Sequence, residues 1–256
     1  RQMCIRDRKT TLCREIGIYC ASREIDVLLV DCDPQGNLSK SLLEEDQLFT
    51  GLYEALDGHA IVVKEVSEHL SLLSGDFRLS ALEKSLVGEM DAFSRLRDLF
   101  ESETFSKYDL ILIDTPPSLG ILTGNALTAG DFLVIPMRPS LYSMQGTNDL
   151  MKTITKVRKT LNPDLQLLGV IINSFDGKPV IYREIKTEIH ESFKDKVFET
   201  SLSQTIKYEE AIAEKVGVID LKKLDKSRAK EEVQRIGVEL LVRLGMNGGK
   251  PWHEKG

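Results

Sequence analysis

Two carboxylates stand directly after an apolar run near the start of the chain. Residues 27–37 read Val-Leu-Leu-Val-Asp-Cys-Asp-Pro-Gln-Gly-Asn, so Asp31 and Asp33 follow four apolar residues and precede Pro34. Side chains alternate along an extended chain, which puts both acids on the same side, and proline is unsuited to a central strand. Ligands of open α/β sheets bind beyond the carboxyl ends of the strands. The pattern predicts a buried strand whose end holds a metal ion or a water molecule.

A second stretch has the same design. Residues 108–117 read Tyr-Asp-Leu-Ile-Leu-Ile-Asp-Thr-Pro-Pro, in which an apolar run again ends in a carboxylate, Asp114, and proline follows. Continuous apolar runs are typical of parallel strands that are buried on both faces. Each run alone is compatible with a plain core strand, but two runs that both end in Asp favour a shared site.

The tripeptide Lys9-Thr10-Thr11 lies just ahead of a predicted helix, residues 12–23, which leads into the first acidic strand. A phosphate-binding loop ends in lysine and threonine because the ammonium group meets the β- and γ-phosphates and the first hydroxyl binds Mg²⁺. The helix N-terminus attracts anions as well. The tripeptide alone is equally compatible with an exposed helix start. The tripeptide favours a phosphate-binding loop here because it lies one helix ahead of Asp33 in the sequence.

Further apolar runs at residues 131–136 and 167–173 alternate with segments of helical length such as residues 141–161. Strands that alternate with helices indicate an α/β fold, here a doubly wound, mainly parallel sheet with helices on both faces. The chain has 256 residues, of which 41% are hydrophobic. We expect a single domain over residues 1–245, followed by a polar tail, residues 246–256.

Composition and charge argue against several classes of protein. The sequence contains no apolar run of about 18 residues and no signal peptide, which predicts a cytoplasmic protein. The histidines and cysteines show no metal-ligand spacing, so no metal other than Mg²⁺ is indicated. The net charge of −6 argues against a protein that coats DNA with its whole surface. Candidates for a local basic patch, each also compatible with a solvated helix face, are Lys178, Arg183, Lys186, Lys207 and residues 222–235.

Together these motifs resemble those of the ParA/Soj group of partition ATPases. In that family Lys-Thr-Thr closes a deviant Walker A loop, Val-Asp-x-Asp-Pro-Gln-Gly-Asn follows, and Ile-Asp-x-Pro-Pro-Ser-Leu-Gly is the Walker B motif. This chain has Lys9–Thr11, residues 30–37 and residues 113–120 in the same order, with Asn-Ala-Leu at residues 125–127. The resemblance covers about residues 9–240 and implies the P-loop NTPase fold.

The resemblance implies a Mg²⁺-dependent ATPase with a role for each motif residue. Lys9 would neutralise the β- and γ-phosphates, Thr10 would ligate Mg²⁺, and Asp114 would hold Mg²⁺ through a water molecule. Asp33 would orient the attacking water. Asp31 would either support the Mg²⁺ shell electrostatically or cap the end of its strand, and both interpretations stay open. The other expected nucleotide contacts are Thr11, Pro116 and Asn173.

The resemblance also implies partners. ATP would close two subunits into a homodimer, the dimer would bind nonspecific DNA on the nucleoid, and a ParB-like centromere-binding protein would stimulate hydrolysis. Lys207 lies near a position at which relatives carry an arginine that is linked to DNA binding, and Arg183 and Lys186 are further candidates. No membrane partner is expected.

The segment before Lys9 departs from the family pattern. The family has Lys-Gly-Gly-Val-Gly there, whereas this chain has Cys4-Ile5-Arg6-Asp7-Arg8. Glycines permit a close backbone approach to phosphate that Ile5 or Arg8 would obstruct. We therefore expect weak or no nucleotide binding if these residues are native, and the abrupt change favours the hypothesis that Cys4–Arg8 is a foreign junction. The strand that precedes the loop in the family is not expected in this chain either.

Three alternatives stay open. A membrane-associated ATPase of the MinD type needs an amphipathic C-terminal helix, but residues 234–244 lack a strongly basic face, so we expect a core-packing helix there. A nucleotide-independent adaptor fits if the altered loop is native. A biosynthetic ligase of the same superfamily needs a substrate pocket, and nothing after the second acidic strand points to one.

Overall fold

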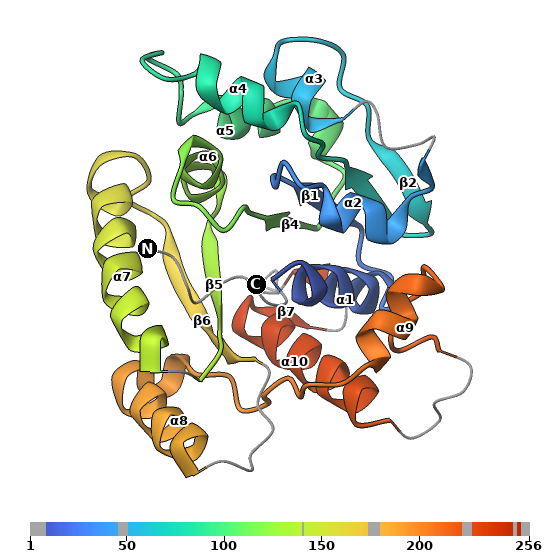
Figure 1. The fold of residues 1–256 in the computed structure, drawn as a ribbon. Helices are drawn as coiled ribbons and strands as arrows, with labels where there is room; N and C mark the ends of the chain where they lie inside the picture. The colour runs from blue at the N-terminus through green and yellow to red at the C-terminus, as the bar shows by residue number, and fades with distance from the viewer. Residues whose placement is uncertain are drawn as a thin grey trace, which may run out of the picture.

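Helices and strands alternate along the chain in the computed structural model, which describes residues 9–45, 51–139, 141–173, 180–221, 227–247 and 250–251 (Figure 1). The strands are β1 (Val27–Asp31), β2 (Lys64–Ser67), β3 (Leu70–Leu73), β4 (Leu110–Asp114), β5 (Phe132–Met137), β6 (Gln166–Ile172), β7 (Met246–Asn247) and β8 (Lys250–Pro251). The α-helices are α1 (Lys9–Ala21), α2 (Asn37–Leu42), α3 (Leu52–Leu56), α4 (Leu79–Ser85), α5 (Arg95–Phe100), α6 (Ile121–Ala129), α7 (Leu141–Thr160), α8 (Val180–Phe193), α9 (Lys207–Ala213) and α10 (Arg228–Arg243).

The longer strands belong to two sheets. In the first sheet the order is β2-β3-β1-β4, where β1 pairs in parallel with both β3 and β4, and β2 pairs antiparallel with β3. In the second sheet β5 and β6 pair in parallel. Asp31 and Asp114 are Cα partners in the register of β1 and β4. The two acidic runs therefore end side by side.

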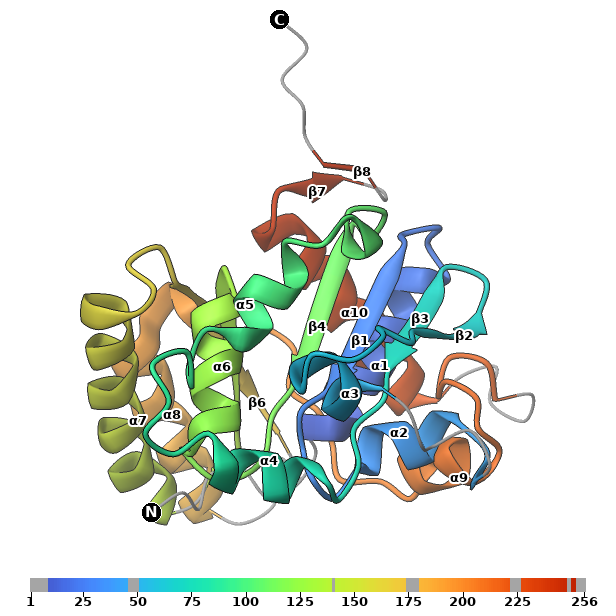
Figure 2. The ribbon, with the colours of Figure 1, turned by 90° about the horizontal axis from the view of Figure 1, so that it is seen from above.

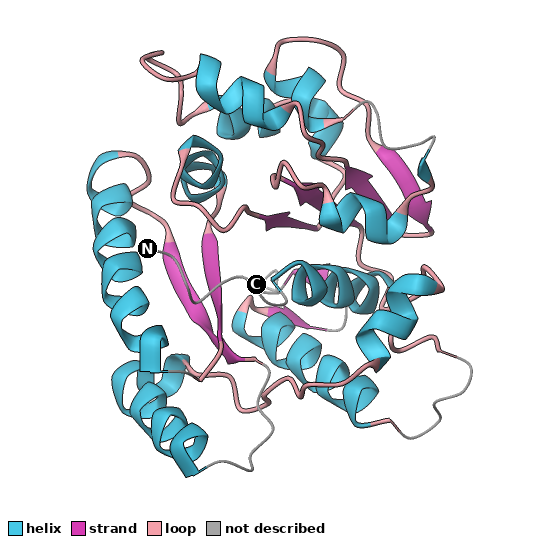
Figure 3. Cartoon of the chain, viewed as in Figure 1, coloured by secondary structure: helices cyan, strands magenta, loops and turns pink. Residues whose placement is uncertain are grey.

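Strand β1 lies between two layers of helices. All of its residues are buried. Val27 and Leu29 belong to a core shared with α1, α9 and α10, whereas Leu28 and Val30 belong to a second core shared with α3 to α6. Side chains that alternate between two covered faces are those of a doubly wound sheet. Figures 2 and 3 show the strands between these helix groups.

A third core joins β5 and β6 to the helices α7 and α8. It includes Ile135 of β5, Val170 of β6, Ile154 of α7 and Ile189 of α8. Figure 1 shows both helices beside the two strands. The β5–β6 pair thus has its own helical cover.

The expected fold class is confirmed, and the expected elements lie close to their predicted places. The apolar runs at 27–31, 110–114, 132–137 and 166–172 are all strands. The helix expected at residues 12–23 begins earlier, at Lys9, and ends at Ala21. Helix α7 matches the segment expected at residues 141–161.

The C-terminal helix α10 packs into the first core, as expected of residues 234–244. Its residues Val233, Ile236 and Leu240 are buried there. Met246, at the start of the expected polar tail, is buried in the same core. Among the described helices, none combines the length and the apolar character that crossing a membrane requires.

Candidate functional site

The carboxylate of Asp31 holds the turn that follows β1. Its Oδ2 accepts hydrogen bonds from the backbone N–H (2.8 Å) and the hydroxyl (2.7 Å) of Ser39, and its Oδ1 accepts one from the N–H of Asp33 (3.2 Å). The Asp31 side chain is fully buried. Three donors from its own connection to α2 favour the capping interpretation of Asp31.

Two glycines allow this turn to close on the neighbouring loop. Gly36 has a φ of 60°, in the left-handed region that favours glycine, and a side chain there would strike the carbonyl of Gly75. A side chain at Gly75 would in turn strike the carbonyl of Asp31. The hydroxyl of Ser39 accepts a hydrogen bond from the N–H of Gly75 (3.0 Å), so one serine links Asp31 to the end of β3.

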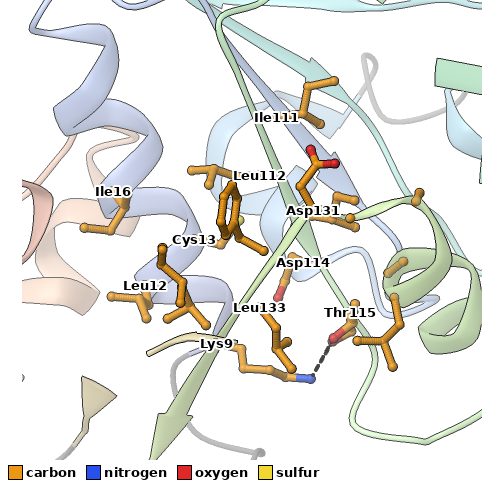
Figure 4. A pocket seen from close by; sticks show the side chains of 18 of the residues that line it. Lys9, Leu12, Cys13, Ile16, Ile111, Leu112, Asp114, Thr115, Asp131 and Leu133 are labelled. Atoms are coloured by element: carbon orange, nitrogen blue, oxygen red, sulfur yellow. Dashed lines mark hydrogen bonds between the residues drawn. The ribbon is translucent and has the colours of Figure 1, made fainter. Parts of the chain in front are cut away.

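The carboxylate of Asp114 faces the start of α1 instead. The hydroxyl of Thr10 donates to its Oδ2 at 2.6 Å. The ammonium group of Lys9 donates to the carbonyl oxygens of Thr115 (2.6 Å) and Pro116 (2.9 Å), as Figure 4 shows for Thr115. The register of β4, which puts Asp114 beside β1, and the first turn of α1 thus bring the predicted lysine, hydroxyl and carboxylate together.

Burial shifts the pKa values of Asp31 and Asp114. Desolvation raises the pKa of Asp114 to about 6, against the hydrogen bond from Thr10 and the nearby Lys9 charge. Desolvation and the neighbouring Asp114 raise the pKa of Asp31 to about 7, against its bonds from Ser39. Desolvation also lowers the pKa of Lys9, while Asp114 opposes that shift. Asp31 and Asp114 are thus two neighbouring buried carboxyl groups, with the single ammonium group of Lys9 near Asp114. A bound cation would supply further positive charge at this site.

The residues at this site fit Mg²⁺. Mg²⁺ takes oxygen ligands and in nucleotide sites keeps only one or two protein ligands beside phosphates and waters. The Thr10 hydroxyl and the Asp114 carboxylate supply two adjacent oxygens. Within the described ranges, no cluster of three or more His, Cys, Asp and Glu side chains could hold a metal alone. A cation here would need ligands from a second molecule.

The other predicted nucleotide residues lie around the same strand ends. The Asp33 carboxylate accepts a hydrogen bond from the N–H of Gln35 (2.9 Å). Asn173 is buried directly after β6, and its N–H donates to the carbonyl of Met137 (2.8 Å). Thr11 is half-buried in the first turn of α1. The loop residues Cys4–Arg8 lie outside the described residues. The roles assigned to all of these residues stay predictions.

The sequence interpretation missed a buried ion pair that fixes α1. Arg14 and Glu15 contact each other and are almost completely buried. Arg14 donates to the carbonyl of Val216 (2.8 Å), and the N–H of Val218 donates to Glu15 (2.7 Å). The pair ties the helix that carries Lys9 to the loop after α9. Adjacent charges in a helical segment resemble a solvated face, so no local pattern indicated this role.

Two of the three predicted DNA contacts, Lys207 and Lys186, lie on different helices. Lys207 begins α9 and pairs with Glu210 at 2.7 Å. Lys186, on α8, donates to the hydroxyl of Ser201 at 3.5 Å. Figures 1 and 2 show α8 and α9 apart. The side chain of Arg183 lies outside the described residues.

Comparison with known proteins connects this geometry to a family. The sequence profile of the family described as AAA domain matches residues 8–167. The match thus begins just before Lys9 and extends into β6. A solved structure of cobyrinic acid a,c-diamide synthase from Mycobacterium smegmatis, with bound ATP analogue and magnesium, superposes with a TM-score of 0.79. It is 26% identical, and the alignment covers 95% of this chain and 93% of that one.

Curated relatives have higher sequence identity. The chromosome partitioning protein ParA of Caulobacter vibrioides is 35% identical over 209 residues, which cover 79% of this chain and 78% of the relative. The sporulation initiation inhibitor protein Soj of Bacillus subtilis is 35% identical over 208 residues, which cover 79% of this chain and 82% of the relative. These shares are large enough to settle the family: the chain belongs to the ParA/Soj family of P-loop ATPases.

Proposed function

We propose that the chain is a Mg²⁺-dependent ATPase that partitions DNA. The observation that carries the proposal is the contact of the Thr10 hydroxyl with the Asp114 carboxylate, beside Lys9. A hydroxyl, an acid and an ammonium group at the ends of parallel strands are the groups that bind Mg²⁺ and polyphosphate. The names of the relatives and the nucleotide in the related structure point to ATP.

The residues divide the chemistry between them. Bound Mg²⁺ would neutralise charge that develops on the transferred phosphoryl group. Thr10 and Asp114 would hold the ion with their side-chain oxygens. Lys9 compensates phosphate charge, and Asp33, whose carboxylate is near Lys9, orients the attacking water. Asp31 acts indirectly by holding the turn that carries Asp33, since its oxygens accept hydrogen bonds from Ser39 and Asp33.

The same lysine couples nucleotide to the loop after β4. Lys9 donates to the carbonyls of Thr115 and Pro116. To meet a phosphate, its ammonium group must exchange these carbonyls for phosphate oxygens. Residues 115–117 would then change their contacts when nucleotide binds, which is the behaviour of a γ-phosphate switch.

The partition role adds a homodimer, DNA and a partner. ATP joins two copies of the chain, the dimer binds nonspecific DNA through basic residues that include Lys207, Arg183 and Lys186, and a ParB-like protein stimulates hydrolysis. The names of the ParA and Soj relatives support this part of the proposal. An ion pair with Glu210 lowers the charge that Lys207 can offer, so DNA binding should require several basic residues together.

The test is binding of a fluorescent ATP analogue with Mg²⁺. Three proteins are compared: the chain as it is, a chain extended by an N-terminal strand, and the extended chain with Cys4–Arg8 replaced by Lys-Gly-Gly-Val-Gly. We expect at least about 100-fold tighter binding by the glycine-loop protein, because glycine allows backbone N–H groups to reach phosphate. Equal tight binding by all three would show that the altered loop does not matter. Binding by none would favour the nucleotide-independent adaptor.

Two assays separate the partition role from the membrane role. The glycine-loop protein should bind plasmid DNA in the presence of ATP, with affinity that falls as salt rises. It should not sediment with anionic lipid vesicles. Sedimentation without DNA binding would instead indicate a MinD-type protein.

A further inference from the structure

The first turn of α6 takes its cap from another helix. Gly120 stands at the N-cap position, just ahead of Ile121, and has no side chain to accept a hydrogen bond. The first N–H groups of a helix have no partner within the helix, and the N-cap side chain usually accepts one of them. Here the Glu83 carboxylate of α4 accepts the N–H of Leu122 at 3.4 Å. Its charge also lies at the positive end of the helix dipole, so α4 stabilises the start of α6.

The close contact between Glu83 and the backbone of α6 explains the glycine at position 120. Gly120 has φ −86° and ψ −165°, an extended conformation that other residues adopt as well. A side chain there would strike Oε1 of Glu83. The Pro-Pro-Ser-Leu-Gly sequence at residues 116–120 thus ends in glycine because a carboxylate from α4 occupies the space that a side chain needs.

Asn125 fastens the same helix a second time. Its side chain is buried, and its Nδ2 donates to the carbonyl of Ala92, ahead of α5, at 2.6 Å. Its Oδ1 accepts a hydrogen bond from the N–H of Leu96, in α5, at 3.1 Å. Figures 1 and 2 show α5 against α6. Glu83 and Asn125 thus hold the first two turns of α6 to the α4–α5 region, which contains none of the residues assigned to nucleotide or Mg²⁺.

The anchored helix in turn holds the end of the loop after β4. The hydroxyl of Thr123 donates to the carbonyl of Ser118 at 2.5 Å. At the start of that loop, the ammonium group of Lys9 donates to the carbonyls of Thr115 and Pro116. Residues 115–118 are therefore held at one end by the group that would meet phosphate and at the other end by α6.

We propose that Glu83 is a positioning residue for the ATPase reaction, because it fixes α6 and with it the far end of the loop after β4. This role rests on the proposed function, in which Lys9 exchanges two carbonyls for phosphate oxygens. A loop that is fixed at its far end responds to this exchange with one defined rearrangement. A loop that is loose at both ends would leave residues 115–117 in many conformations, few of which suit hydrolysis.

A plain helix cap and a positioning residue can be separated by experiment. Serine at an N-cap position accepts an N–H group of its own helix, so Gly120→Ser can cap α6 from within once Glu83 is replaced by alanine. The double variant Glu83→Ala/Gly120→Ser then has a capped α6 that is no longer bonded to Glu83. The matched control is Glu89→Ala, because Glu89 is an exposed glutamate in the same α4–α5 connection.

The first measurement is hydrogen exchange of the chain as it is, followed by NMR. Glu83→Ala should speed the exchange of residues 122–124 about 3- to 10-fold, the usual effect of losing a helix cap. The double variant should return these residues to the rate of the unsubstituted chain. The amides of Thr115, Ser118 and Leu119 should exchange faster in both variants, because both lack the bond from α6 to Glu83.

The second measurement is ATP hydrolysis by the glycine-loop protein. Glu83→Ala and the double variant should both lower kcat about 10-fold, the usual effect of removing a residue that orients groups around a metal and its substrate. KM for ATP should stay within about 2-fold, because Lys9 and Thr10 still meet the nucleotide. Glu89→Ala should leave both constants unchanged.

Recovery of kcat in the double variant would show that Glu83 only caps α6, and it would overturn the proposal. A kcat that Glu83→Ala leaves unchanged would overturn it as well. If the unsubstituted glycine-loop protein does not hydrolyse ATP, the proposed function fails, and the amides of Thr115, Ser118 and Leu119 decide whether Glu83 holds the loop. Faster exchange of these amides in the double variant supports the anchor, and exchange at the unsubstituted rate rules it out.

Discussion

Strands β1 and β4 are neighbours with nearly the same sequence design but different surroundings. Each has four apolar residues followed by an aspartate, and the two aspartates are register partners. Strand β1 has a neighbour on both sides and is fully buried. Among the strands that the structure describes, β4 pairs with one neighbour, and it is half-buried along most of its length.

The two aspartates differ accordingly. Asp31 accepts three hydrogen bonds from Asp33 in the following turn and Ser39 in α2, whereas Asp114 accepts one from the Thr10 hydroxyl and one from the backbone N–H of Thr115 and lies beside Lys9. Asp31 is therefore committed to the fold, and Asp114 keeps oxygen atoms for a ligand. Two strands with similar sequences thus end in aspartates with different roles, because different elements surround the strand ends.

The largest expected difference between the two acids is in hydrolysis. In the strand-extended, glycine-loop protein, Asp114→Asn should lower ATP hydrolysis about 10²- to 10³-fold, the usual effect of removing one group that stabilises transition-state charge. Asp31→Asn should lower it less than about 10-fold, because Asp31 acts through the turn. Phosphate release at saturating Mg²⁺ and ATP measures both, and equal losses would remove the distinction between the acids.

Stability should change in the opposite order. At pH 5, below the raised pKa values of both acids, Asp31→Ala leaves three buried donors without an acceptor and should cost about 3 kcal/mol. Asp114→Ala removes one bond from the Thr10 hydroxyl and one from the backbone N–H of Thr115 and should cost less, about 1–2 kcal/mol. Urea unfolding gives both values, and Ser39→Ala, which deletes only one of the donors to Asp31, is the matched control. A larger loss for Asp114→Ala would contradict this assignment.

The sequence predicted β1, β4, β5 and β6 well, because continuous apolar runs are a local signal, sharpened at β1 and β4 by the prolines that follow. It missed the antiparallel β2–β3 pair, since β2 reads Lys-Glu-Val-Ser and lies at the edge of the sheet, where polar residues are tolerated. It grouped Lys9, Thr10 and Asp114 as the structure does. The structure also shows two features that no local pattern predicts. Ser39 bonds to Gly75, and the buried Arg14–Glu15 pair bonds to the loop after α9, both far away in sequence.

The raised pKa values predict a pH dependence of stability. Between about pH 4 and pH 7 the folded protein holds protons on Asp31 and Asp114 that the unfolded chain has lost, so stability should fall as pH rises. The slope should reach about 1.4 kcal/mol per pH unit for each proton. Asp114→Asn should roughly halve the slope below pH 6 and move the end of the fall below pH 7, because the Asp114 charge helps to raise the pKa of Asp31. Urea unfolding from pH 4.5 to pH 8 tests this, and a rise in stability over that range would contradict it.

The smallest effect tests the open edge of β4 directly. Ala126 lines an apolar cavity of about 670 Å³ between β4 and β5, whereas Ala211 is fully buried among packed side chains of the first core. Ala211→Leu should cost about 1–3 kcal/mol by overpacking, but Ala126→Leu should change stability by less than about 0.5 kcal/mol, because its added carbons enter open space. Urea unfolding measures both costs. Equal costs of the two substitutions would show that the side chains beside β4 are packed as closely as those around β1.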